Sequence, residues 1–246
     1  MSVATLARAR RAQALGRKWG DCLADDDFVA LPGTELAGWF PPADLERLAA
    51  TWEHLPRDEA VSGGVVRERR YGRLTATREA TGEWRFAALP HRAFQQTAEH
   101  IPLHGGRARM FSPIPPETLT DPVLTALIAL DLDIISAVVP RTSRFEVGLH
   151  QMRVLATPGA PGSPTPEGRH RDGHDFIGMH LMGRVHCAGG ESVVHREGRP
   201  PTRMTLTERL DSLVVSDTRI THEVTPTVAD GATGVRDMLL VDINER

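Results

Sequence analysis

The sequence predicts an α+β fold in which helices support a jelly roll of short strands. Up to about residue 140, apolar residues recur mainly at helical spacing. From Phe145 onward the apolar runs shorten, are rich in Val, Ile and Thr, and are separated by Gly, Pro or Asp, as in antiparallel strands. The chain of 246 residues lies near the upper end of what one core supports. We therefore expect a single domain, 1–246, with a mainly helical support and some strands in 1–140 and a jelly-roll core in 141–246.

The chain begins with a candidate basic helix. The first twenty residues carry four arginines and Lys18 but no acid. The acidic run Asp25-Asp26-Asp27 follows at once, which favours an amphipathic helix over a mitochondrial presequence. A second helix is expected after Pro41-Pro42, where apolar residues recur at helical spacing up to Trp52.

One strand and one buried helix complete the predicted support. Val65 to Thr77 has the composition of a strand. Asp121-Pro122 places an acid and a proline where a helix should begin. The following stretch, Leu124 to Val139, is the most apolar in the chain and is too short to cross a bilayer, so we expect a buried helix that braces a sheet.

The second half contains the strands of the predicted jelly roll. Short strands at this spacing favour a jelly roll or barrel over a parallel sheet. The candidates are Phe145 to Leu155, Asp175 to Met182, Glu191 to His195, Leu213 to Val215, His222 to Thr225 and Asp237 to Ile243.

Charge and composition exclude several function classes. The 29 basic and 32 acidic residues leave a net charge of -3, which does not favour binding to nucleic acid or to an anionic membrane. Lys18 is the only lysine and precedes Trp19, so there is no Walker loop and no good Schiff-base lysine. Cys22 and Cys187 are isolated, which excludes a disulfide framework and fits the reducing cytoplasm. We expect a small-molecule partner and predict no oligomeric state.

Histidines concentrate where the jelly roll is expected, and two of them suggest a metal site. His170 and Asp172 have the H-x-D spacing, which sends both side chains to one face of an extended chain and lets them bind one metal. A late strand of a jelly roll can bring His222 beside them. Arg236 begins the last apolar strand and should share the same mouth of the barrel. Seven of the eleven histidines lie in this half, namely His150, His170, His174, His180, His186, His195 and His222.

Taken in order, several segments resemble the iron(II)/2-oxoglutarate-dependent dioxygenases, specifically the branch of bacterial free amino acid hydroxylases that includes L-isoleucine dioxygenase. The resemblance lies in the second half, and residues 1–110 contribute little to it. It rests on His150-Gln151-Met152-Arg153, Pro166 to Phe176, Gly189-Gly190-Glu191-Ser192, His222-Glu223-Val224-Thr225-Pro226 and Arg236-Asp237.

The resemblance implies a double-stranded β-helix, a cupin-like jelly-roll barrel, braced by N-terminal helices. It also implies that His170, Asp172 and His222 bind Fe(II), that 2-oxoglutarate and O2 are consumed, and that an unactivated carbon of a free L-amino acid or derivative is hydroxylated. Two imidazoles and one carboxylate suit non-haem Fe(II) and leave coordination positions open. Arg236 would bind the far carboxylate of 2-oxoglutarate with its planar guanidinium.

The cosubstrate anchor has alternatives. Many relatives place a hydroxyl residue two positions after the arginine, whereas Met238 stands there. Either another hydroxyl such as Thr225 completes the site, or Arg219 is the anchor instead of Arg236.

For the residues that bind the substrate, the sequence offers several candidates. A free amino acid needs a cation for its carboxylate, for which Arg153 is a candidate with His150 beside it, and Glu167 could bind the ammonium. We expect His174 to be turned away from the metal by Gly173, while His180 lines the pocket or lies in the core with equal weight.

Two other functions compete with the dioxygenase. A zinc hydrolase could use His170, Asp172, His174 or His222 to activate water, since zinc accepts the same donors. It lacks the usual zinc-hydrolase motifs and gives Arg236 no task. A jelly-roll binding module without turnover would not explain a complete triad with open positions.

Overall fold

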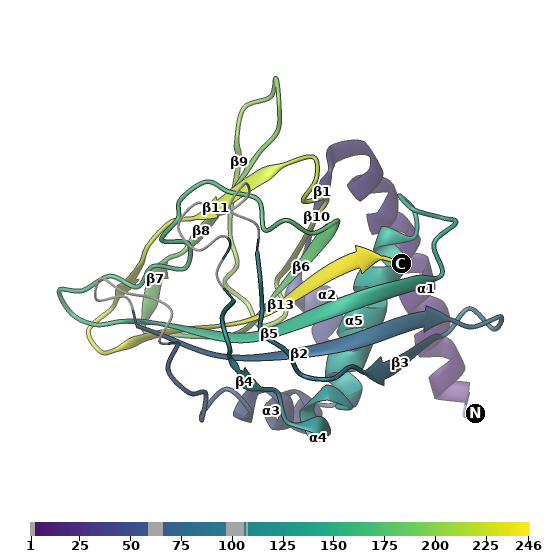
Figure 1. The fold of residues 1–246 in the computed structure, drawn as a ribbon, viewed down its shortest axis with the longest axis horizontal. Coiled ribbons are helices and arrows are strands. Elements are labelled where there is room, and N and C mark those ends of the chain that lie inside the picture. The colour runs from purple at the N-terminus through teal and green to yellow at the C-terminus, as the bar shows by residue number, and fades with distance from the viewer. Residues whose placement is uncertain (1–2, 59–65, 97–105, 107) are drawn as a thin grey trace.

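The computed structural model describes residues 3–58, 66–96, 106 and 108–246, and of residues 3–14 the backbone alone (Figure 1). The helices are α1 Val3–Asp26, α2 Gly33–Ala37, α3 Pro42–Ala50, α4 Pro116–Leu119 and α5 Pro122–Ile135. The strands are β1 Phe28–Leu31, β2 Val66–Arg78, β3 Trp84–Ala88, β4 Ser112–Pro113, β5 Arg144–Ala156, β6 Phe176–Val185, β7 Cys187–Gly189, β8 Glu191–His195, β9 Thr202–Thr205, β10 Ser212–Val215, β11 Thr221–Val224, β12 Thr227–Ala229 and β13 Gly234–Glu245. The predicted helices and strands are all present, with bounds that differ by a few residues.

The predicted start of the buried helix is confirmed in detail. Asp121 is the N-cap of α5, and its Oδ1 accepts hydrogen bonds from the backbone N–H groups of Val123 (2.8 Å) and Leu124 (3.3 Å). Pro122 occupies the first turn, where its missing N–H costs nothing. Among the helices in the described ranges, none is long and apolar enough to cross a membrane.

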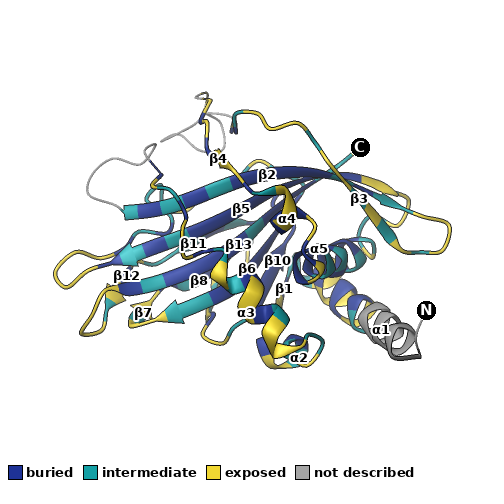
Figure 2. Cartoon of the chain, turned by 90° about the horizontal axis from the view of Figure 1, so that it is seen from below, coloured by how far each residue is buried: buried dark blue, intermediate teal, exposed yellow. Residues whose placement is uncertain are grey.

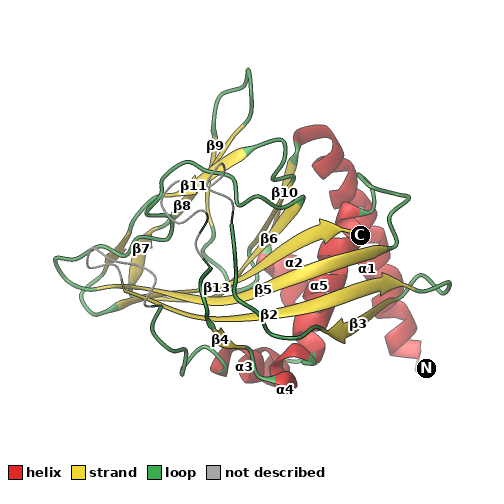
Figure 3. Ribbon diagram, viewed as in Figure 1, coloured by secondary structure: helices red, strands yellow, loops and turns green. Residues whose placement is uncertain are grey.

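The strands form one large sheet and two small ones (Figure 3). The large sheet has eight strands in the order β1-β10-β6-β13-β5-β2-β3, with β4 paired to β2. The small sheets are β11-β8-β9 and β12-β7. The pairings are antiparallel except that of β2 with β4, as a jelly roll requires.

The two faces of the large sheet have different neighbours. On β13, Leu239, Val241 and Ile243 pack in the core that the sheet shares with the helices, whereas Met238 and Leu240 on the other face belong to a second apolar cluster. Figure 2 shows α1 and α5 side by side along one face of this sheet. Side chains alternate between faces along a strand, so the face decides which residues can reach a site inside the barrel.

A buried polar cluster fixes α5 on the sheet. His180 of β6 is fully buried, and its Nε2 lies 2.9 Å from Asp131 Oδ2 while its Nδ1 lies 2.7 Å from Ser212 Oγ. Asp131 sits directly over Gly178, where a Cβ would come within 2.2 Å of the carboxylate. His180 is therefore a core histidine on the helix face of the sheet, and the alternative that it lines the pocket is wrong.

Candidate active site

Backbone pairing places the two expected histidine ligands side by side. His170, in the loop after β5, exchanges two hydrogen bonds with His222 of β11: N–H of His170 to O of His222 at 3.0 Å, and the reverse at 2.9 Å. Directly opposed residues of an antiparallel pair project to the same side. The two imidazole rings therefore meet, with centroids 4.6 Å apart.

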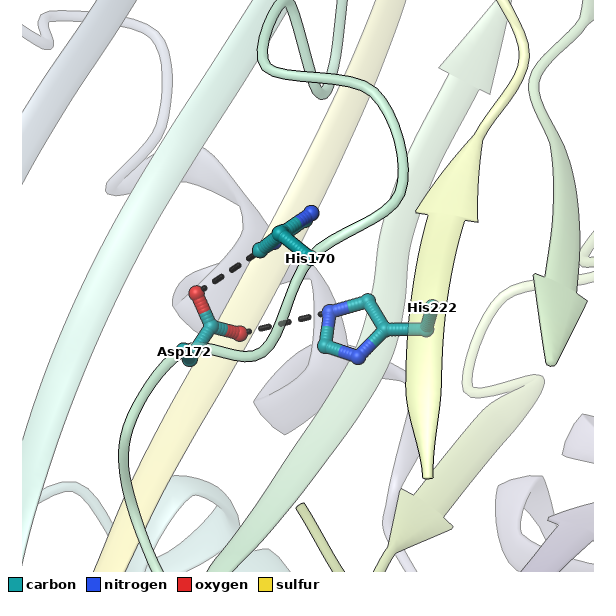
Figure 4. Close-up of side chains that lie close together, drawn as sticks. All are labelled: His170, Asp172 and His222. Atoms are coloured by element: carbon teal, nitrogen blue, oxygen red, sulfur yellow. Dashed lines mark ion pairs between the residues drawn. The ribbon is translucent and has the colours of Figure 1, made fainter. Parts of the chain in front are cut away.

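Asp172 completes the cluster (Figure 4). Its Oδ1 lies 3.5 Å from Nε2 of His170, and its Oδ2 lies 3.3 Å from Nε2 of His222. One possible ligand atom from each of the three side chains falls within 4.8 Å of the others, and among the described residues this is the one such group of His, Cys, Asp and Glu. The predicted residues are thus brought together on one side of the barrel interior.

The loop that carries Asp172 is held by a second carboxylate. Buried Asp217 accepts hydrogen bonds from the backbone N–H groups of Asp172 (3.1 Å), Gly173 (2.8 Å) and His174 (3.2 Å). Gly173 has a φ of 87°, which turns the chain after Asp172. As expected, the His174 imidazole is turned away from the cluster, and its Nε2 lies 3.3 Å from Asp242.

In the metal-free site the triad is held as an ion pair, so a divalent metal must displace the proton of His170 when it binds. Burial alone would raise the pKa of Asp172, but the imidazoles of His170 and His222 hold that pKa well below its usual range. Burial opposes the charge on His170 too, yet Asp172 and Glu167 raise the pKa of its imidazole to about 9. The Nδ1 of His170 lies 2.8 Å from the carbonyl of Gly168, which orients the ring and leaves Nε2 for the site.

The donor set fits a first-row divalent metal. Two imidazole nitrogens and one carboxylate oxygen on one side of an ion form the facial arrangement typical of non-haem Fe(II), and leave its other side open. That side faces a pocket lined by the triad and by a floor of apolar side chains. The floor consists of Met152, Ile177, Met179, Met238 and Leu240.

Arg236 lies in this pocket without a described anionic partner. Its side chain is 2% exposed, and its Nε is buried with no hydrogen-bond partner among the described residues. Burial and the nearby Arg184 lower the pKa of Arg236 to about 10, which still leaves the guanidinium charged at neutral pH. By contrast, Arg219 is 63% exposed and pairs with Asp27 at 3.4 Å. The alternative that Arg219 anchors the cosubstrate is therefore wrong on position.

Two other residues expected near a ligand, Thr225 and Arg153, lie elsewhere. The Thr225 hydroxyl accepts a hydrogen bond from the Glu191 backbone at 2.9 Å and does not line the pocket. Arg153 is on the opposite face of β5 and binds Asp237 through two hydrogen bonds of 2.7 and 2.9 Å. The expectation that Arg153 contacts substrate is corrected, because strand alternation points it away from the barrel interior.

His150 and Glu167 have different outcomes. His150 faces the interior but is fully buried behind Arg69, with Nε2 2.8 Å from Asp242. Burial and the charge of Arg69 lower the pKa of His150 to about 4, so the ring is neutral. It does not line the pocket. Glu167 does line it, and its Oε1 lies 3.6 Å from Nε2 of His170.

The structure adds polar residues from the first half of the chain. Arg67 and Arg69 of β2, together with Arg109, line the same pocket. The side-chain amide of Gln96 donates a hydrogen bond to Oδ1 of Asp172 at 3.2 Å. The side-chain oxygen of Gln96 accepts a hydrogen bond from Arg109. The sequence contained a signal for β2, since arginines at i and i+2 of a strand share one face.

Two histidines and one carboxylate beside a buried arginine are also found in a known family of enzymes, and the sequence matches that family over most of its length. Residues 49–242 match the family described as 2OG-Fe dioxygenase. The chain belongs to this family. The expected double-stranded β-helix is confirmed, and the family is one of dioxygenases that use iron and 2-oxoglutarate. The triad has the residue types that the iron of this family requires.

Individual relatives agree with the family. L-isoleucine-4-hydroxylase from Bacillus thuringiensis is 28% identical over 151 residues, which cover 59% of this chain and 62% of that protein. The chain thus spans a little under two thirds of that relative. 3(1)-Hydroxy-L-isoleucine 4-dioxygenase from Pantoea ananatis (strain AJ13355) is 28% identical over 80% of both chains. The crystal structure of a bsmA homologue from Methylobium petroleophilum PM1 superposes with a TM-score of 0.82 at 29% identity, over 93% of this chain and 92% of that one.

The competing functions find no support. A zinc hydrolase or a binding module without turnover would not match this family, and His174 is directed to Asp242 instead of the triad.

Proposed function

We propose that this dioxygenase hydroxylates an unactivated carbon of a free L-amino acid or a close derivative. The observation that carries the proposal is one pocket in which the triad, a buried arginine without a described anionic partner and an apolar floor meet. The named relatives act on isoleucine or hydroxyisoleucine, which supports an aliphatic amino acid as substrate.

The roles of this chain's residues follow from their positions. His170 and His222 would each present Nε2 to Fe(II), and Asp172 would supply the anionic ligand. Asp217 would hold the Asp172 loop in place through its three backbone hydrogen bonds. Bound iron and 2-oxoglutarate supply the oxidising chemistry, in which O2 is consumed, CO2 and succinate are released, and one oxygen atom enters the substrate.

Arg236 would bind the far carboxylate of 2-oxoglutarate. Its guanidinium is fixed next to Gly190, where a Cβ would come within 3.4 Å of Arg236 Cδ and Nε. No hydroxyl residue stands beside it at Met238, and Thr225 is engaged elsewhere. We therefore propose that Arg236 alone supplies the charged contact to that carboxylate. The apolar floor would exclude water from the reacting carbon.

A turnover assay tests the proposal. The purified protein is given Fe(II), 2-oxoglutarate, O2 and a panel of L-amino acids, while succinate and hydroxylated product are measured. We expect succinate and product in equal amounts with at least one amino acid. Zinc should inhibit, because it accepts the same ligands but has no accessible redox change. Hydrolysis activated by zinc without 2-oxoglutarate would contradict the proposal.

We also propose that the protein acts in the cytoplasm on a small molecule. Cys22 and Cys187 are both free thiols in the structure, which suits a reducing compartment.

A further inference from the structure

The pocket holds more positive charge than iron and 2-oxoglutarate need. Among the described residues its lining includes Arg67, Arg69, Arg109 and Arg236, and the carboxylates of Glu167 and Asp172 alone. One end of 2-oxoglutarate would chelate the metal and the other would take Arg236. The arginine cluster, defined as Arg67, Arg69 and Arg109, therefore has no task in holding the cosubstrate.

The arginine cluster is separated from Arg236 by the width of one strand. In the register of the sheet, Arg67 lies opposite Val154, which lies opposite Arg236. The strands β2 and β13 flank β5, which sets their axes roughly 9–10 Å apart. Two residues further along these strands, Met152 of β5 lies between Arg69 of β2 and Met238 of β13. The pocket thus has two cationic ends with an apolar floor between them.

Arg69 is the member of the cluster best prepared to receive an anion. Its Nε and Nη2 both donate to Nδ1 of His150, at 3.2 and 2.9 Å, and that ring is neutral. Among the described residues no partner is found for its Nη1. Its guanidinium lies over the ring of Phe111, 4.4 Å from the centroid, which fixes its plane. Arg69 is thus a rigid cation that has no direct carboxylate partner within the described part of the chain.

The other two arginines have partners and act as supports. Arg67 pairs with Asp58 at 3.4 Å and donates to the carbonyl of Pro164 at 3.2 Å, in the loop that carries Glu167. Arg109 donates to Gln96, which holds Asp172. Their charges add to the positive potential around Arg69.

Glu167 offers the opposite charge in the same pocket. Its side chain is 10% exposed, and its Oε2 is buried without a hydrogen-bond partner among the described residues. A buried carboxylate oxygen left unpaired is costly, so it is expected to find a donor when the pocket is filled. Its charge also acts on Arg109, which places it close to the arginine cluster.

We propose that Arg69 binds the substrate's α-carboxylate and Glu167 its α-ammonium, so that the enzyme selects free amino acids by both charges. This inference rests on the proposed function. A zwitterion held in this way would direct its side chain across the apolar floor, which favours aliphatic side chains. Arg67 and Arg109 make no direct contact with the substrate in this arrangement and bind Pro164 and Gln96 beside the site.

Calorimetric binding to the anaerobic Fe(II) and 2-oxoglutarate form tests the inference without turnover. A panel of L-amino acids, beginning with L-isoleucine, identifies the tightest ligand, which is compared with its decarboxylated amine and its 2-hydroxy acid. For isoleucine these are 2-methylbutylamine and 2-hydroxy-3-methylpentanoate. We expect each analogue to bind about ten- to a hundredfold more weakly than the amino acid, since each lacks one charge-assisted contact.

Two variants assign the contacts to residues. Arg69→Gln should weaken amino acid binding about ten- to a hundredfold and leave binding of the amine unchanged. Glu167→Gln should weaken amino acid binding and leave the hydroxy acid unchanged. The matched controls are the exposed Arg219→Gln and Glu46→Gln, which should bind like the unaltered protein. Iron content and 2-oxoglutarate affinity are measured for each variant and should stay within about twofold.

Several results would overturn the inference. The first is that the unaltered protein binds the amine as tightly as the amino acid. The second is that Arg69→Gln lowers the affinity for all three ligands equally. The third is that no L-amino acid binds. If Arg69→Gln does not fold, the analogues and Arg69→Lys, which keeps the charge but loses the planar fork, carry the test. Slow succinate formation from 2-oxoglutarate alone would show that the iron chemistry survives a failure of this inference.

Discussion

At the scale of single residues, the site combines ion pairs with two buried arginines, Arg69 and Arg236, for which the described residues supply no carboxylate partner. Arg236 lies against Gly190, whose φ of 67° and missing side chain let the arginine lie close to the backbone. Asp217 accepts three hydrogen bonds from backbone N–H groups, and Nδ1 of His222 lies 3.8 Å from its Oδ1. The remaining charges face the pocket, where ligands can use them.

Arg236→Gln is predicted to raise the KM for 2-oxoglutarate about ten- to a hundredfold, since a charge-assisted bidentate pair contributes about 1.5–3 kcal/mol. Iron affinity should be nearly unchanged. Arg236→Lys should recover part of the loss. Steady-state kinetics with Arg219→Gln as the control checks this, and an unchanged KM in Arg236→Gln would remove Arg236 from the cosubstrate site.

Arg153→Gln should affect stability and not catalysis. It removes a bidentate pair with Asp237, whose side chains are 18% and 11% exposed, and leaves a carboxylate whose pKa burial already raises. We expect the free energy of unfolding to fall by about 1–3 kcal/mol in urea denaturation, with the KM for substrate unchanged. If the KM for substrate rises strongly while the free energy of unfolding is unchanged, Arg153 contacts the substrate after all.

His150 should make stability depend on pH in the acid range. Its pKa is about 4 in the folded protein against an ordinary 6.5, so the neutral ring favours the folded state. This contribution is complete above pH 6.5 and is lost as the pH falls toward 4, at about 1.4 kcal/mol per pH unit, or about 3 kcal/mol in all. In urea denaturation at several pH values, the free energy of unfolding of His150→Asn should fall less steeply with decreasing pH than that of the unaltered protein. Equal slopes would mean that the ring is charged when buried.

The residue scale also shows what the sequence could predict. The spacing of His170 and Asp172 with a later histidine predicted the triad, because local extended geometry and one strand pairing suffice to bring it together. Arg153 was assigned to substrate because its face on β5 could not be known without the register. Arg69 was missed because its value depends on tertiary contacts with His150 and Phe111.

At the scale of elements, the sheet is positioned by the contact between α5 and β6. Asp131 on α5 occupies the space that a side chain at position 178 of β6 would need. Both residues are buried, and the Asp131 carboxylate is also held by Nε2 of His180 at 2.9 Å. The sequence predicted the helix from its cap and its apolar pattern, but not this contact, which depends on how the helix crosses the sheet.

Gly178→Ala is predicted to destabilise the protein by at least about 2 kcal/mol, since its Cβ would lie 2.2 Å from Asp131 Oδ2. The control is Gly38→Ala at the end of α2, where nothing lies within 4 Å and φ is -67°. That variant should stay within about 0.5 kcal/mol of the unaltered protein. Thermal unfolding of both variants checks the prediction, and equal midpoints would show that α5 can shift on the sheet.

At the scale of the whole molecule, the pocket is built from both halves of the chain. The triad, Glu167 and Arg236 come from the second half, whereas Arg67, Arg69 and Arg109 come from the first. The family resemblance visible in the sequence lay in the second half. It therefore predicted the iron chemistry but did not identify the arginines at the substrate end of the pocket. The strand β2 joins the two, because it pairs with β5 along most of its length.

The central claim is that His170, Asp172 and His222 hold iron in a form that binds 2-oxoglutarate. An anaerobic titration of Fe(II) and 2-oxoglutarate, followed by visible absorption, tests it most directly. We predict a charge-transfer band that saturates at one iron per chain in the unaltered protein and in Arg219→Gln. Asp172→Ala should abolish the band and the bound iron, since it removes the one anionic ligand of the triad. Full iron content and an unchanged band in Asp172→Ala would contradict the claim.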